Sequence, residues 1–138
     1  MERYFVDSNI FLRYYSHDDK LQSEQAEGFF LRAKRGEIKI FCGPPVFFEV
    51  AWVLKTFYKL PNVTILDTLE SMLSIPNFTV FDSEHVIKAI ELARKKSCGF
   101  ADSFGYSVTT FRGGWNRKSQ RRGGWGCPSE PSTTGVRR

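Results

Sequence analysis

The sequence lacks the features by which several classes of protein are recognised. No stretch reaches the roughly 18 consecutive apolar residues of a membrane-spanning helix, so we expect no membrane segment. The first residues contain no apolar run of the kind that secretory signal peptides carry. The three cysteines are odd in number and have no paired or metal-type spacing, which argues against a disulfide framework. We therefore expect a cytoplasmic protein.

Several catalytic motifs are also missing. Residues 1–111 contain no glycine-rich phosphate loop and no GxSxG nucleophile motif. Histidine is scarce, since only His17 and His85 occur, and neither has a second His or Cys at the spacing of zinc ligands. These absences argue against a P-loop enzyme, a serine hydrolase of the elbow type and a zinc enzyme.

Positive charge has no excess in the first four-fifths of the chain. Residues 1–111 carry 13 basic and 14 acidic side chains, whereas residues 112–138 carry seven basic and one acidic. All 13 phenylalanines occur by Phe111, and six of the 11 glycines follow it. We predict one α/β domain at 1–111 and a basic, disordered Gly/Arg/Ser-rich tail at 112–138. The net charge of +5 therefore says little about what the domain binds.

Strand and helix signals alternate along the domain. Short β-prone runs occur at 4–6, 38–41 and 78–81, and helical segments at 10–15, 18–35, 46–60, 62–74, 83–97 and from 100. Strands separated by helices predict a parallel sheet, with a site at the carboxyl ends of its strands. The segment 46–54 is apolar around its whole circumference, so we expect that helix to be buried.

Three carboxylates stand apart from basic neighbours. Asp7 follows the first strand, Glu49 lies in the second turn of the 46–60 helix, and Asp102 is near the start of the last helix. An ionised carboxylate in apolar surroundings is costly unless something compensates its charge. Helix capping would account for Asp7 and Asp102 but poorly for Glu49. A divalent cation, which prefers oxygen ligands, would account for all three, and separate caps and pairs remain the alternative.

The same acids lie in three motifs that occur in a fixed order. These are FVDSNIFL at 5–12, VFFEVAWVL at 46–54 and GFADSF at 99–104. Together they resemble PIN-domain ribonucleases, and most of all the VapC-type toxins of prokaryotic toxin–antitoxin pairs. The resemblance covers about residues 1–108. It implies a doubly wound parallel sheet with flanking helices.

The resemblance also implies a site and its partners. By position it makes Asp7, Glu49 and Asp102 both catalytic residues and ligands of Mg²⁺ or Mn²⁺, with Ser8 or Asn9 orienting them. Water activated by the metal would attack an RNA phosphate, so no covalent nucleophile is required. The implied partners are an RNA substrate and a cognate antitoxin, and a homodimer is a further option.

The end of the chain departs from the family pattern. In that family a further strand and a fourth acid, in a Thr-Phe-Asp-like motif, follow the helix that carries the third acid. Here Thr110-Phe111-Arg112 comes early and has arginine at the place of the acid. We therefore expect the fourth ligand and the last strands to be absent. Three interpretations of the tail remain open: an RNA-binding extension, an inert terminus, or an out-of-frame readout of the gene.

Two functions remain open beside an active ribonuclease. One is a catalytically impaired PIN-like protein that acts by binding an antitoxin or its own copy through exposed aromatics. The other is a haloacid-dehalogenase-like phosphohydrolase, which also has an Asp after its first strand. That second family needs another Asp two positions on, where this chain has Asn9. Binding of a cognate partner without metal-dependent nuclease activity would favour the catalytically impaired PIN-like protein.

Overall fold

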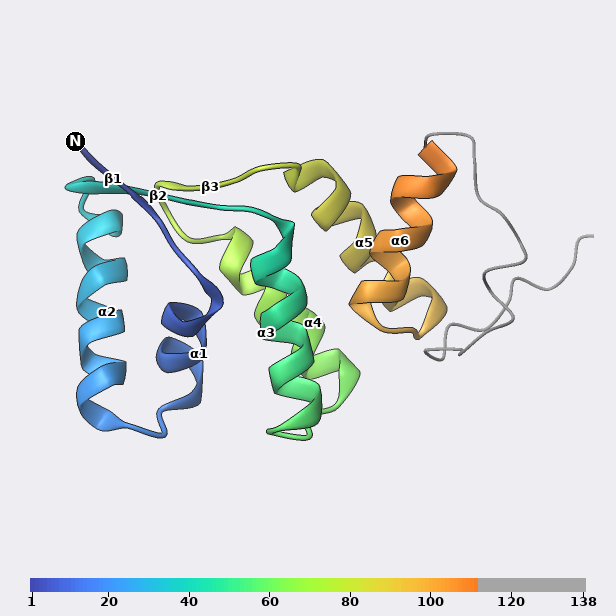
Figure 1. The fold of residues 1–138 in the computed structure, drawn as a ribbon, viewed down its shortest axis with the longest axis horizontal. Coiled ribbons are helices and arrows are strands. Elements are labelled where there is room, and N and C mark those ends of the chain that lie inside the picture. The colour runs from blue at the N-terminus through green and yellow to red at the C-terminus, as the bar shows by residue number, and fades with distance from the viewer. Residues whose placement is uncertain (112–138) are drawn as a thin grey trace, which may run out of the picture.

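A computed structural model describes residues 1–111, which form three strands and six helices (Figure 1). In chain order they are β1 (Glu2–Phe5), α1 (Ser8–Ser16), α2 (Lys20–Lys34), β2 (Ile38–Cys42), α3 (Pro44–Thr56), α4 (Asn62–Leu73), β3 (Phe78–Val80), α5 (Ser83–Lys96) and α6 (Phe100–Phe111). Each strand and helix predicted from the sequence overlaps one of these elements. The predictions about residues 112–138 concern a part of the chain outside the described residues. They are that this part forms a disordered tail and that the fourth ligand and the last strands are absent.

The strands form one parallel sheet in the order β1-β2-β3. The register pairs Phe5 with Phe41, and Phe41 with Thr79. Parallel neighbours need crossover connections, which α1 and α2 provide between β1 and β2, and α3 and α4 between β2 and β3. The α/β class with a parallel sheet and flanking helices is therefore confirmed. All three strands end at the same edge, which is the edge where the site is expected.

The two faces of this sheet have different surroundings. Ile38, Ile40 and Cys42 of β2 are completely buried, whereas Lys39 and Phe41 between them stay partly exposed. Successive side chains of a strand point to opposite faces, so one face is buried and the other meets solvent. Helices α1 to α4 lie on one side of the strands, with α5 and α6 beyond the end of the sheet (Figure 1).

One hydrophobic core joins the buried face of the sheet to the helices. Phe11 of α1 packs against Phe30 of α2 and Phe78 of β3, with ring centroids 5.3 and 5.4 Å apart. The largest fully buried side chains also include Phe47, Ile38, Ile40, Leu66, Leu69 and Met72. Within this part of the chain no helix is both long and apolar enough to cross a membrane.

Helix α3 corrects one expectation from the sequence, because it is not buried around its circumference. Val46, Phe47, Val50 and Leu54 are buried and lie at the spacing of a single helical stripe. On the other side Trp52 is 57% exposed, and Glu49 is exposed as well. Glu49 therefore needs no counter-charge to offset burial, and one premise of the metal-site prediction does not hold.

Candidate active site

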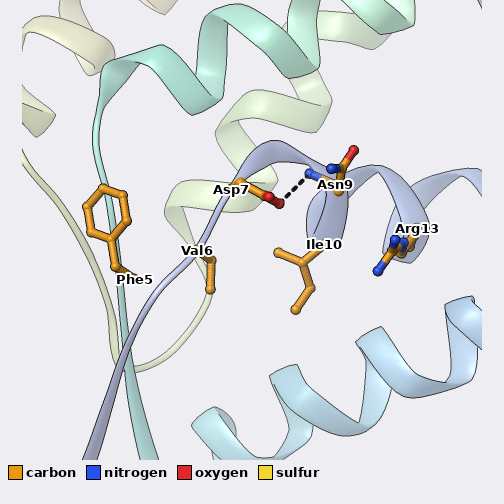
Figure 2. Close-up of a pocket in the computed structure, with 6 residues that line it drawn as sticks. All are labelled: Phe5, Val6, Asp7, Asn9, Ile10 and Arg13. Atoms are coloured by element: carbon orange, nitrogen blue, oxygen red, sulfur yellow. Dashed lines mark hydrogen bonds between the residues drawn. The ribbon is translucent and has the colours of Figure 1, made fainter.

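Asp7 lies where β1 ends and α1 begins. It is the N-cap of α1, and its Oδ1 accepts a hydrogen bond from the backbone N–H of Asn9 at 3.0 Å (Figure 2). The capping interpretation is thus confirmed for this residue. The side chain is exposed, and within residues 1–111 its Oδ2 accepts no hydrogen bond. One carboxylate oxygen of Asp7 therefore remains able to bind a ligand.

Asp7 also lines a shallow pocket of about 290 Å³. Val6 and Ile10 give it an apolar part, while Asn9 and Arg13 supply polar groups beside the carboxylate (Figure 2). Arg13 stands one turn after Asn9 on α1, and residues four apart share a helix face. Arg13 was not among the site residues predicted from the sequence, although its spacing from Asn9 could have indicated it. The pocket offers a carboxylate for a cation and a guanidinium for an anion.

A hydrogen bond connects this end of β1 to helix α3. The Ser8 hydroxyl donates to Oε2 of Glu49 at 2.8 Å, across a sequence separation of 41 residues. Ser8 is 3% exposed, so the donor is held in place by its surroundings while the carboxylate it contacts faces solvent. The first two acidic motifs therefore meet through a serine side chain.

Asp102 has a different environment, in the first turn of α6. The side chain is half-buried, and this burial raises the pKa of Asp102, while the positive charge of Lys55 on α3 acts in the opposite direction. Its Oδ2 would lie 3.9 Å from a Cβ built on Gly99, so the carboxylate turns back toward the start of its own helix. The effect of Lys55 on this acid was not predicted from the sequence.

Aromatic contacts fix α6 against α3 in this position. The ring of Phe48 lies 4.9 Å from that of Phe104 and 5.3 Å from that of Phe100, measured between centroids. Both contacts come from residues that flank Asp102 on α6. The place of the third acid is therefore set by the packing of these two helices.

Comparison with protein families decides the ancestry of the chain. The sequence model of the family described as PIN domain matches residues 4–113. The chain belongs to the PIN domain family. PIN domains are generally nucleases, and they typically depend on divalent metal ions. No curated protein sequence matches the chain.

The acids of this PIN domain have the chemistry that a divalent cation prefers, but they are not grouped closely enough in the described residues to hold one. Exposed carboxylates such as Asp7 and Glu49 are the oxygen donors that Mg²⁺ and Mn²⁺ prefer. Yet within residues 1–111 no three His, Cys, Asp or Glu side chains are grouped closely enough to hold a metal ion. The structure links Glu49 to the residue after Asp7, and the positive charge of Lys55 acts on Asp102.

Proposed function

We propose that this chain is a metal-dependent endoribonuclease that hydrolyses RNA phosphodiester bonds and acts as the toxin of a cytoplasmic toxin–antitoxin pair. Membership of the PIN domain family supports the nuclease activity. The likeness of its three acidic motifs to VapC-type toxins supports the toxin role and a cognate antitoxin as partner. The observation that carries the proposal is the 2.8 Å bond from Ser8 to Glu49, which brings two acidic motifs together at the carboxyl edge of the sheet.

In this proposal Asp7, Glu49 and Asp102 are the protein ligands of Mg²⁺ or Mn²⁺. When bound, such an ion lowers the pKa of water and neutralises charge on a phosphate. Asp102, in the first turn of α6, supplies the third carboxylate of this set.

Other residues around these acids have positioning and binding roles. Ser8 holds one oxygen of Glu49 and so restricts where the carboxylate can point. The backbone N–H of Asn9 does the same for Asp7. Arg13 lines the same pocket as Asp7, and its guanidinium suits a phosphate oxygen of the RNA backbone.

Metal titration of single variants tests the ligand set directly. Mn²⁺ binding is measured by calorimetry, and cleavage by incubation of an RNA pool with Mg²⁺ or Mn²⁺, for wild type, Asp7→Asn, Glu49→Gln and Asp102→Asn. We expect each variant to bind Mn²⁺ more weakly and to lose cleavage. Asp19→Asn is the matched control, because Asp19 caps α2 with the same kind of bond, to the N–H of Gln22 at 3.1 Å.

The results separate the parts of the proposal. Cleavage that persists in a contaminant-free preparation of Asp7→Asn would refute the assignment of the metal-dependent active site to Asp7. Unchanged Mn²⁺ affinity in Asp102→Asn would remove only that residue from the ligand set. The toxin role predicts that induced expression arrests the growth of a bacterial host and that Asp7→Asn restores growth.

A further inference from the structure

The solvent-facing side of the sheet gathers aromatic and basic side chains. Phe5 is 73% exposed and Phe81 is 54% exposed. Phe41 stands between them, because it pairs in register with Phe5 and its ring stacks on that of Phe81 at 6.2 Å and 23°. Arg3 and Lys39 pair in the same register and share this side. We call these five residues the aromatic face.

Backbone hydrogen bonds of the sheet fix the positions from which the three rings project. The N–H of Phe81 donates to the carbonyl of Cys42 at 2.9 Å, and the N–H of Val6 donates to the carbonyl of Phe41 at 3.0 Å. Each ring therefore projects from a hydrogen-bonded strand or from the residue directly after one. Exposed aromatic rings are unusual on a parallel sheet, which is normally covered on both faces. Exposed apolar patches of this kind mark interaction surfaces.

We propose that the aromatic face binds single-stranded RNA, with bases stacked on Phe5, Phe41 and Phe81. This inference rests on the proposed function and names the form of RNA that the same site would take. Bases of any sequence stack on aromatic rings, and an unpaired strand exposes its bases for such contacts. In a duplex the bases are already stacked on one another, so the face discriminates against paired RNA.

The basic residues of the face complement the phosphates of a bound strand. Lys39 Nζ lies 5.7 Å from the centroid of the Phe41 ring, so base and phosphate contacts adjoin each other. Arg3 follows on the neighbouring strand at the paired position. Glu37, the acid nearest to Lys39 in the sequence, forms an ion pair with Arg32 at 3.5 Å. The charge that this face presents is therefore positive, which suits a polyanion.

The aromatic face is continuous with the candidate active site. Phe5 belongs to the face and also lines the pocket that contains Asp7 and Arg13 (Figure 2). A strand that stacks on Phe5 thus has its next phosphate close to the end of β1. Binding on the face would hold an RNA strand beside the acids without using them.

A second copy of the chain suits this face less well. Copies that pack face to face about a two-fold axis place each residue near its own equivalent. Arg3 and Lys39 would then approach other basic groups in an interface that excludes water. Burying cations without acidic partners is costly, so the charge of the face favours a nucleic acid over self-association.

The experiment measures RNA binding by the full chain in EDTA, which prevents metal-dependent cleavage. Fluorescence anisotropy follows a short labelled single strand and a duplex of the same sequence. The variants are Phe5→Ser, Phe81→Ser and Lys39→Gln. Phe57→Ser is the matched control, because Phe57 is 73% exposed like Phe5 but directly follows α3, away from the sheet.

We expect Phe5→Ser and Phe81→Ser each to weaken single-strand binding by about 5- to 150-fold, the range measured for removing one stacked ring. Phe57→Ser should bind as wild type does, and the duplex should bind more weakly than the single strand. Lys39→Gln should reduce the slope of log affinity against log salt by about 0.7. Circular dichroism checks that the exposed substitutions leave the fold intact.

Two results would overturn the inference. Wild-type affinity in both Phe5→Ser and Phe81→Ser would place RNA binding elsewhere in the chain. A dimer that Phe5→Ser dissociates in sedimentation, with RNA binding unchanged, would identify the face as a self-association surface. Phe5-dependent binding without any cleavage in Mg²⁺ or Mn²⁺ would instead refute the proposed nuclease activity and leave the RNA-binding face standing.

Discussion

Removal of the Ser8 hydroxyl tests the contact that joins the start of α1 to α3. Ser8→Ala deletes the 2.8 Å bond to Glu49 from a residue that is only 3% exposed. A hydrogen bond to a charged group is worth about 1.5–3 kcal/mol. The Glu49 carboxylate faces solvent, so water replaces part of what it loses, and we expect a cost below that range, about 1 kcal/mol. That cost corresponds to a melting temperature lower by about 4–8 °C for a domain of this size.

A double-mutant cycle separates this bond from other effects of the substitution. The free energy of unfolding in urea is measured for wild type, Ser8→Ala, Glu49→Ala and the double variant. We expect a coupling energy of about 1 kcal/mol. Ser23→Ala supplies the matched control, because Ser23 is also buried and its Oγ lies 2.8 Å from Nδ1 of His17. The losses of unfolding free energy caused by Ser23→Ala and by Glu49→Ala should add in the double variant.

Additivity in the first cycle would contradict the reasoning. If the stability losses of Ser8→Ala and Glu49→Ala add to within about 0.3 kcal/mol, the bond does not contribute in solution. The proposed function would then lose the observation that brings its first two acidic motifs together. A second readout guards against a purely structural effect: Ser8→Ala should also weaken Mn²⁺ binding, whereas Ser23→Ala should not.

Three further predictions concern burial. Burial raises the pKa of Asp102 above its ordinary value of 3.8, so the charged form of this side chain opposes folding. Asp102→Asn should therefore raise the melting temperature at neutral pH and leave it unchanged below pH 3.8. Equal changes in melting temperature at both pH values would contradict this. Burial also raises the pKa of the Cys42 thiol to about 12, so iodoacetamide at neutral pH should label Cys42 only after urea unfolding, as peptide mass spectrometry would reveal. Phe47 is completely buried, so Phe47→Ala should cost about 3–5 kcal/mol in urea unfolding. Phe57→Ala should stay within about 0.5 kcal/mol, and similar losses in both would refute the assignment of the core.

The elements of the domain could be predicted because their signals are local. Short β-prone runs separated by helical segments suffice for a parallel α/β sheet. The exposure of α3 could not be predicted in this way. An apolar side chain such as Trp52 contributes to a hydrophobic pattern equally whether a neighbour or solvent covers it. Only the three-dimensional structure, in which Val50 and Leu54 belong to the core, shows which side of the helix is exposed to solvent.

The candidate site could be predicted in part, for the same physical reason. Asp7 directly follows a strand, and α3 begins directly after the next strand, so topology alone brings Asp7 and Glu49 toward one edge. Asp102 depends on how α6 packs against α3, which the rings of Phe48 and Phe104 decide. Such a contact between distant side chains leaves no local pattern. The resemblance names three acids as candidates, but it does not predict where the packing of α6 places Asp102.

The sequence of β2 does carry a signal for the aromatic face. A strand buried on both faces is usually apolar throughout, but this strand has Lys39 at its second position. The residues to either side, Ile38 and Ile40, are fully buried, so the alternation marks one covered face and one solvated face. Lys39 would be costly to bury if a helix covered this face without an acidic partner. The composition of the strand therefore agrees with a face that stays open for a polyanion.

The two proposals can be separated because Phe5 of β1 supplies an aromatic ring, whereas Asp7, which follows the strand, supplies a carboxylate. Phe5 lies on the aromatic face, and Asp7 follows two positions later at the edge, where it lines the pocket with Arg13. Phe5→Ser removes a stacking ring without touching a carboxylate, so it should weaken RNA binding in EDTA and leave Mn²⁺ affinity unchanged. Asp7→Asn should do the reverse, with single-strand binding retained and metal-dependent cleavage lost. If either substitution impaired both properties while the fold remained intact, the face and the edge would act as one site.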